Sequence, residues 1–149
     1  MTVIGITLDK SGYSYTVLDG DRSNPRLVAF DNIPINNCEN TQQLVNWYET
    51  TFENLITRFN PAAIGAKVSL NAKKAEIAPW YYPLGLLHNI SYRKGIVVHE
   101  FVSQNFTPSK FGFSKDVDIY NHVDATFGIQ TPKWSKNQKS SVLAGWIIL

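Results

Sequence analysis

Three β-forming runs near the start of the chain are joined by connections too short to cross from one end of a sheet to the other. Residues 3–8 form a β-branched run, residues 13–18 alternate between the two faces of a strand, and residues 27–33 form a third run. Gly12 and the segment 19–25 supply turn residues between these runs. Parallel neighbours need a crossover of about a dozen residues or more. The sequence therefore predicts an antiparallel three-strand meander.

The strongest helical signal follows this meander. Its apolar residues recur at spacings of three and four, which is typical of one helix face packed against a sheet. Asn40 or Thr41 can cap the start of this helix. The pair Asn60-Pro61 ends it. The apolar face consists of Leu44, Trp47, Tyr48, Phe52, Leu55, Ile56 and Phe59.

The rest of the chain alternates between strand and helix patterns. Residues 62–68 are predicted to be a short buried strand, which should pair parallel with the first strand because a helix precedes it, and residues 96–101 are predicted to be a fifth strand. Further helices are expected at residues 84–90, 108–111, 116–127 and 136–149. The predicted fold is a single α/β domain spanning residues 1–149, with a mixed sheet and helices on its faces.

Composition excludes several classes of protein. Aromatic residues make up 13% of the chain and the net charge is only +2, which argues against intrinsic disorder. Cys38 is the single cysteine, so no disulfide scaffold exists, and no apolar run approaches the ~20 residues of a membrane span. The three histidines have no metal-ligand spacing, so no zinc site is expected. A free cysteine and a start without a charged leader predict a cytoplasmic protein.

The order of the elements, together with several short segments, resembles the RNase H-like superfamily and, within it, the Holliday-junction-resolvase branch. Residues 3–6 (Val-Ile-Gly-Ile) resemble the start of those enzymes, in which an aspartate that ligates a metal comes next. Residues 64–67 match the strand that ends in a second acid, residues 107–110 match a Pro-containing loop, and residues 139–146 match a helix that carries one or two aspartates. The resemblance covers most of the chain and implies an RNase H-like fold and metal-dependent nuclease ancestry.

The acidic positions of that pattern are not acidic in this sequence. Thr7 stands at the first and Lys67 at the second, and residues 133–149 contain no carboxylate. Two Mg²⁺ ions about 4 Å apart would need such carboxylates as ligands. We therefore expect no catalysis and no cofactor, with Mg²⁺ or Mn²⁺ only under an alternative hypothesis. The Lys67 ammonium could hold a phosphate, or its stem could pack on the sheet while its head reaches water.

Asp9 offers an alternative acidic site. It lies two residues beyond Thr7 and therefore points to the same face of the strand. With Asp19 or Asp21 it could form a displaced metal site. The sequence Asp9-Lys10-Ser11-Gly12 is equally typical of the tip of a hairpin.

Basic and aromatic residues are the remaining candidates for binding. Trp80, Tyr81 and Tyr82 lie between two prolines, which argues against the interior of a regular helix. These rings could cap the core, form a protein interface or stack on bases beside positive charge. The candidate nucleic-acid or partner-binding residues are Lys67, Lys73, Lys74, Trp80, Tyr81, Tyr82, Arg93, Lys133, Lys136 and Lys139.

The predicted function is that of a catalytically degenerate RNase H-like binding protein, a pseudo-nuclease. Its partner would be nucleic acid, another protein or a second copy of the chain, and not a membrane. One alternative is a metal-dependent, structure-selective nuclease that uses a relocated acidic set around Asp9. The other is a small inhibitor or immunity-type protein that binds one protein partner.

Overall fold

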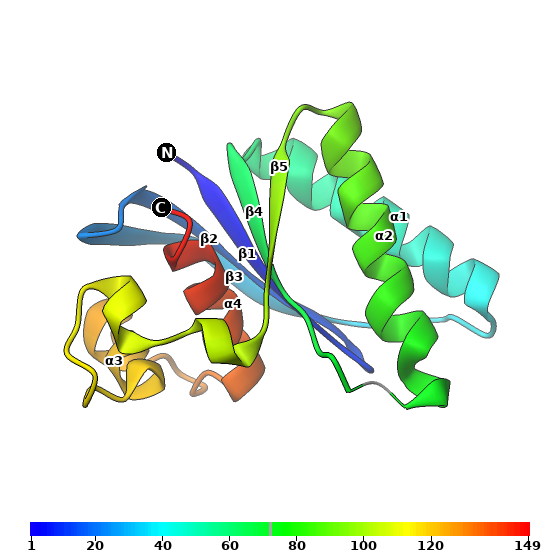
Figure 1. The fold of residues 1–149 in the computed structure, drawn as a ribbon. Coiled ribbons are helices and arrows are strands. Elements are labelled where there is room, and N and C mark those ends of the chain that lie inside the picture. The colour runs from blue at the N-terminus through cyan, green and yellow to red at the C-terminus, as the bar shows by residue number, and fades with distance from the viewer. Residues whose placement is uncertain (72) are drawn as a thin grey trace.

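A five-stranded mixed sheet forms the centre of the computed structural model, which describes residues 1–71 and 73–149 (Figure 1). Its strands, in the spatial order β3-β2-β1-β4-β5, are β1 (Val3–Asp9), β2 (Gly12–Asp21), β3 (Asn24–Pro34), β4 (Ala63–Lys67) and β5 (Val97–Phe101). The helices are α1 (Thr41–Phe59), α2 (Ile77–Arg93), α3 (Ile119–Phe127) and α4 (Lys136–Trp146). Short 3₁₀ turns are η1 (Lys74–Glu76), η2 (Ser103–Asn105) and η3 (Pro108–Phe111).

Strand pairing confirms the predicted topology. β1 pairs antiparallel with β2, and β2 pairs antiparallel with β3, so the first three strands form the expected meander. β4 pairs parallel with β1 on its other side, and β5 pairs parallel with β4. The order of strands and helices predicted from the sequence is the order observed.

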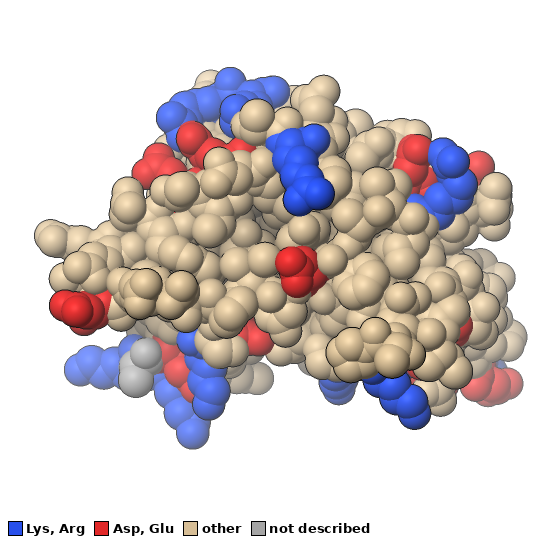
Figure 2. All heavy atoms as spheres, turned by 180° about the vertical axis from the view of Figure 1, so that it is seen from behind, with Lys and Arg blue, Asp and Glu red and all other residues tan. Residues whose placement is uncertain are grey.

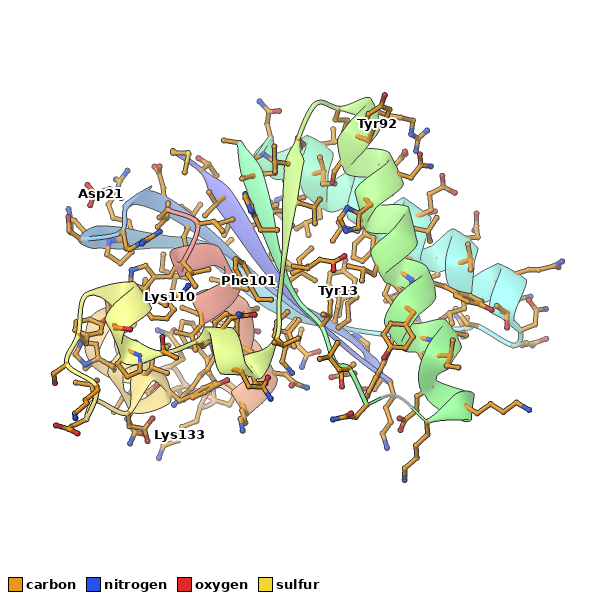
Figure 3. The ribbon with its side chains drawn as sticks, viewed as in Figure 1. Tyr13, Asp21, Tyr92, Phe101, Lys110 and Lys133 are labelled. Carbon is orange, nitrogen blue, oxygen red and sulfur yellow. The ribbon has the colours of Figure 1, made fainter. Side chains whose placement is uncertain are left out.

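The sheet is the middle of three layers, with α1 and α2 on one face and α3 and α4 on the other (Figure 1). Alternate residues of β1 point to opposite faces. Ile4 and Ile6 join the core under α1 and α2, whereas Val3 joins the core under α4. Tyr13 of β2 lies in the layer between the sheet and α1 (Figure 3). No helix among the described residues is long and apolar enough to cross a membrane.

The ends of α1 follow the sequence signals. The side chain of Asn40 accepts a hydrogen bond from the backbone N–H of Gln43, which makes Asn40 the cap. Asn60 adopts the left-handed conformation, and its N–H bonds to the carbonyl of Ile56, which ends the helix before Pro61.

The aromatic segment between the two prolines lies inside α2, so the prediction that it could not be helical is wrong. Pro79 is the third residue of α2, where the backbone N–H would have no partner within the helix anyway. Pro83 cannot donate to the carbonyl of Pro79. The hydroxyl of Tyr48 on α1 donates to that carbonyl instead, at 3.5 Å. Burial raises the pKa of Tyr48 above its usual range, so this hydroxyl keeps its proton.

Helix α4 lies directly on the strand backbone at two glycines. A Cβ on Gly5 of β1 would overlap the carbonyl oxygen of Ser141 and lie 2.5 Å from the nitrogen of Gly145. A Cβ on Gly65 of β4 would overlap the carbonyl oxygen of Ala144. Because these glycines have no side chain, α4 packs directly against the strand backbone, and residues 140–147 are all buried. The helix ends at Trp146, three residues earlier than predicted.

We expect Gly5→Ala to destabilise the fold by about 3 kcal/mol, because the new methyl group must push α4 off the sheet. Gly85→Ala is the matched control, since a Cβ at this α2 position meets nothing within 4 Å. That change should be neutral or stabilise by up to about 1 kcal/mol. Urea unfolding of both variants measures the two effects, and equal midpoints would contradict the close-packing account.

Candidate functional site

Thr7 and Lys67, the two strand positions that would be acidic in the resolvase branch, lie side by side at the carboxyl ends of β1 and β4. Thr7 and Lys67 are direct partners in the parallel register, and adjacent strands lie about 4.8 Å apart. Both side chains project from the α4 face of the sheet. Thr7 is 1% exposed, and its hydroxyl has no hydrogen-bond partner among the described residues. The observed pair is a buried hydroxyl beside an amine.

The first turn of α4 completes this site. The Ser135 side chain caps the helix by accepting from the backbone N–H of Gln138. The amide of Asn137 donates to Oδ2 of Asp9 at 2.8 Å, which fixes the start of α4 over the end of β1. We call Thr7, Asp9, Lys67, Lys136 and Asn137 the strand-end corner.

Asn137 was not among the residues predicted from the sequence. Ser140 and Ser141 follow Asn137 by three and four residues, so the three side chains lie on one face of the helix. This helical spacing of polar residues is the signal that could have indicated Asn137.

The carboxylate of Asp9 is already engaged in the turn between β1 and β2. Its Oδ1 accepts hydrogen bonds from the backbone N–H of Ser11 at 2.6 Å and from the Ser11 hydroxyl at 2.7 Å. The hairpin-tip interpretation of this segment is therefore confirmed.

The displaced acidic site built from Asp9 and other aspartates of the hairpin is wrong. Asp19 lies at the far end of the hairpin, where it accepts from Arg26 and from the N-terminal ammonium. Asp21 bonds to Ser23 in the next turn. In the described part of the chain, no three His, Cys, Asp or Glu side chains come together in a group that could hold a metal.

Lys67 is the charged centre of the strand-end corner. Its side chain is half-buried, and burial together with the nearby Lys136 ammonium lowers the pKa of Lys67 below its ordinary 10.5. Across the described residues, no carboxylate oxygen lies within 4.0 Å of the Lys67 ammonium. The charge of Lys136 acts on Lys67, while the Lys136 ammonium itself lies over the ring of Tyr120, 5.4 Å from the ring centroid.

A buried polar layer under α4 keeps the strand-end corner in place. The amide of Gln138 donates to the carbonyl of Tyr15 at 2.9 Å and to the hydroxyl of Thr16 at 2.8 Å. The hydroxyls of Thr16 and Ser141 lie 2.7 Å apart. Because these polar atoms satisfy one another away from water, shifting α4 along the sheet would leave buried groups unpaired.

The other predicted cationic residues are dispersed. Lys139 is paired with Asp124, and Arg93 at the end of α2 is paired with Glu49 and Glu53 of α1. Lys73 and Lys74 are exposed at the start of η1. Lys133 is exposed at the lower rim, in the loop before α4 (Figure 3). Lys136 is the one predicted lysine that the structure brings close to Lys67.

The aromatic triplet does not form one stacking platform. Trp80 is half-buried with its indole nitrogen shielded from solvent, and the hydroxyl of Tyr81 donates to the carbonyl of Ser69 at 2.9 Å. Tyr82 is the member that is 49% exposed. Arg93 is eleven residues further along α2 than Tyr82, about 16 Å at 1.5 Å per residue. The arrangement favours helix packing for Trp80 and Tyr81.

Charge on the back of the molecule is dispersed as well. Figure 2 shows Lys and Arg side chains in separate groups, most of them near the rim and several of them beside acidic side chains. This face offers no continuous basic field, so an anionic partner that bound on this face would be recognised locally.

Solved structures identify the architecture. No family model matches the sequence, and no curated protein matches it. The structure of Thermus thermophilus RuvC in complex with a Holliday junction substrate superimposes with a TM-score of 0.78 at 14% identity, covering 99% of this chain and 91% of that chain. The yeast mitochondrial Holliday junction resolvase Ydc2 gives 0.63 at 12% identity, over 97% and 77% of the two chains. The fowlpox virus Holliday junction resolvase gives 0.63 at 13%, over 97% and 94%.

The chain therefore has the RNase H-like fold. Solved structures that share this fold with the chain include Holliday junction resolvases, as the order of elements predicted.

Placing acids at the paired strand positions should create a metal site. In the double variant Thr7→Asp/Lys67→Glu, two carboxylates would project from the same face of neighbouring strands, beside Asp9. We expect Mn²⁺ to raise the melting temperature of this variant, with a gain of about 2.7 kcal/mol at 100 times Kd. The control is Thr7→Asn/Lys67→Gln, which has similar shape and no charge. A Mn²⁺ response of the control equal to that of the double variant would contradict the assignment.

Lys67→Met should stabilise the chain, because it removes a half-buried ammonium that faces Lys136. Exposure and screening limit the gain to roughly 0.5 kcal/mol. Because the pKa of Lys67 is lowered in the folded state, the unfolded state holds this proton more tightly. The charged Lys67 therefore lowers the free energy of unfolding by its full amount at neutral pH. The advantage of Lys67→Met should therefore shrink as pH rises through the lowered pKa towards 10.5. Thermal unfolding at neutral and alkaline pH measures this, and an advantage that grew with pH would contradict it.

Proposed function

We propose that this protein binds nucleic acid through the strand-end corner and does not cleave it by a two-metal mechanism. The observation that carries this proposal is Lys67, an amine without a close carboxylate partner, next to Thr7 at the converging strand ends. The likeness to T. thermophilus RuvC and to the fowlpox virus resolvase, both of which have been solved with Holliday junction DNA, supports nucleic acid as the partner class.

The absence of cleavage follows from the chemistry of the strand-end corner. Two-metal catalysis needs several oxygen ligands that hold cations about 4 Å apart. The corner supplies one carboxylate, Asp9, and its two oxygens already accept hydrogen bonds from Ser11 and Asn137. The ammonium of Lys67 repels a divalent cation at the position where a ligand would be needed.

The choice of nucleic acid over a protein partner rests on charge. The charge of Lys136 disfavours the charged form of Lys67, and a run of phosphates would supply counter-charge at this position. Lys133, which is exposed before the start of α4, would add a further phosphate contact. Shape-selective binding to phosphates at this corner does not require a continuous basic field, and the face in Figure 2 has none.

The decisive experiment is fluorescence anisotropy with labelled single-stranded, duplex and four-way-junction DNA. Each should be titrated at two salt concentrations, with EDTA and with Mn²⁺, and the same samples examined for cleavage on a denaturing gel. Salt-sensitive binding without cleavage supports the proposal. Mn²⁺-dependent cleavage would replace it with a nuclease that uses a relocated acidic site. A lack of binding at low salt would favour a protein partner, such as the target of a small inhibitor or immunity-type protein.

A charge-reversal variant locates the surface. Lys67→Glu/Lys133→Glu/Lys136→Glu should lose most of its DNA affinity while keeping its melting temperature. Each lost phosphate contact should lower the slope of log affinity against log salt by about 0.9 for duplex DNA.

The matched control reverses three exposed lysines elsewhere, Lys94, Lys110 and Lys115, and makes the same change in net charge. If both triple variants weaken binding equally, the effect is one of overall charge and the corner is not the binding surface.

A further inference from the structure

A crevice opens where the chain leaves β4 and β5 in opposite directions. After β4 the chain passes to α2, which covers one face of the sheet. After β5 it passes through η2 and η3 to α3 and α4, which cover the other face (Figure 1). In α/β sheets, ligands bind in the gap outside the carboxyl ends of two strands whose connections diverge in this way.

The crevice is polar and large enough for a small anion. It has a volume of about 330 Å³, the space of on the order of ten water molecules. Lys67 lies at the end of β4, where the crevice begins. Hydroxyl and amide side chains form much of the remaining wall. The lining residues are Lys67, Val68, Ser69, Leu70, Asn71, Val102, Ser103 and Gln104.

The charges around the crevice favour an anion. Lys67 lines it, and Lys136 lies close enough to disfavour a second positive charge at that position. None of the crevice-lining residues is acidic. Asp9 is the carboxylate of the strand-end corner, and its oxygens accept from Ser11 and Asn137.

We propose that this crevice holds a phosphate group directly on the Lys67 ammonium, without a metal ion. The proposal rests on the proposed nucleic-acid function and names the chemical group that the same site recognises. The phosphate would supply counter-charge to Lys67, and the hydroxyl of Ser103 and the amide of Gln104 in the crevice wall are available donors for its oxygens. Both residues are exposed at the crevice, and no side-chain hydrogen bond to another described residue engages either of them.

A Lys67 side chain that only reaches water would not explain why the crevice beside it is polar and has no acidic lining residue. A solvated surface lysine gains nothing from a second ammonium beside it or from a polar pocket with no acid in its wall. The walls come from two loops far apart in sequence, at residues 68–71 and 102–104, so the polar lining results from the fold and not from one local motif.

Inorganic phosphate and pyrophosphate are the probes for this site. Calorimetric titration in EDTA at constant ionic strength, with chloride as the balancing anion, measures their binding to the whole protein. We expect binding to the natural sequence and about tenfold or greater weakening in Lys67→Met, because a charge-assisted contact is lost. Lys94→Met, at the exposed end of α2, is the matched control and should bind as the natural sequence does. Since Lys67→Met should be at least as stable, a loss of binding in it does not come from unfolding.

Three results would overturn the proposal. These are no phosphate binding, equal binding by Lys67→Met, and binding that appears only when Mg²⁺ or Mn²⁺ is added, since the cation would then hold the anion.

Oligonucleotides separate this proposal from the function on which it rests. A single strand with a 5′-phosphate is compared with the same strand ending in a hydroxyl, for the natural sequence and for Lys67→Met. A preference for the phosphorylated end that disappears in Lys67→Met identifies a terminal phosphate, whereas equal weakening of both strands identifies an internal phosphodiester. DNA binding that Lys67→Met leaves unchanged would contradict the phosphate site and the strand-end corner as the DNA surface, but not nucleic-acid binding by the protein. Phosphate binding without any DNA binding would contradict the proposed nucleic-acid function but not the phosphate site.

Discussion

The backbone contact between α4 and the strands beneath it is the constraint on which the rest of the structure depends. Glycines at positions 5 and 65 leave no side chain between helix and sheet, so α4 approaches until its carbonyl oxygens meet the strands. That closeness brings Asn137 to Asp9 and Lys136 to the neighbourhood of Lys67. A helix held further out by ordinary side chains would leave the ends of β1 and β4 open to solvent, without a defined site.

Local signals in the sequence were sufficient for the fold. Short turns required the meander, and Asn40 and Asn60 marked the ends of α1, because caps act through neighbouring backbone groups. The start of α2 was missed for a non-local reason. The carbonyl left free by Pro83 finds a donor in Tyr48, thirty-one residues away from Pro79, and a partner at that distance cannot be read from the sequence around the prolines.

The candidate site was only partly predictable. The resemblance identified Thr7 and Lys67 as the two positions that are acidic in the resolvase branch. The strand register makes these two residues direct partners, because positions that are equivalent in a shared topology lie side by side in the sheet. The crevice wall at Ser69, Ser103 and Gln104 was not foreseen, since loops carry no periodicity that locates them. Lys139 and Arg93 looked equivalent to Lys67 in the sequence. Their acidic partners Asp124 and Glu53, distant in the chain, show that their charges are neutralised within the protein.

The pairing of Thr7 with Lys67 also determines how single substitutions at these two positions would act. A single Thr7→Asp change would place its carboxylate beside an ammonium, and the two would neutralise each other before any cation could bind. A single Lys67→Glu change would leave one new acid facing a hydroxyl. Neither change alone provides two carboxylates that are free to hold a cation, so only the double substitution would build a metal site at these strand ends. Metal binding at this position therefore depends on two paired residues changed together and not on either one alone.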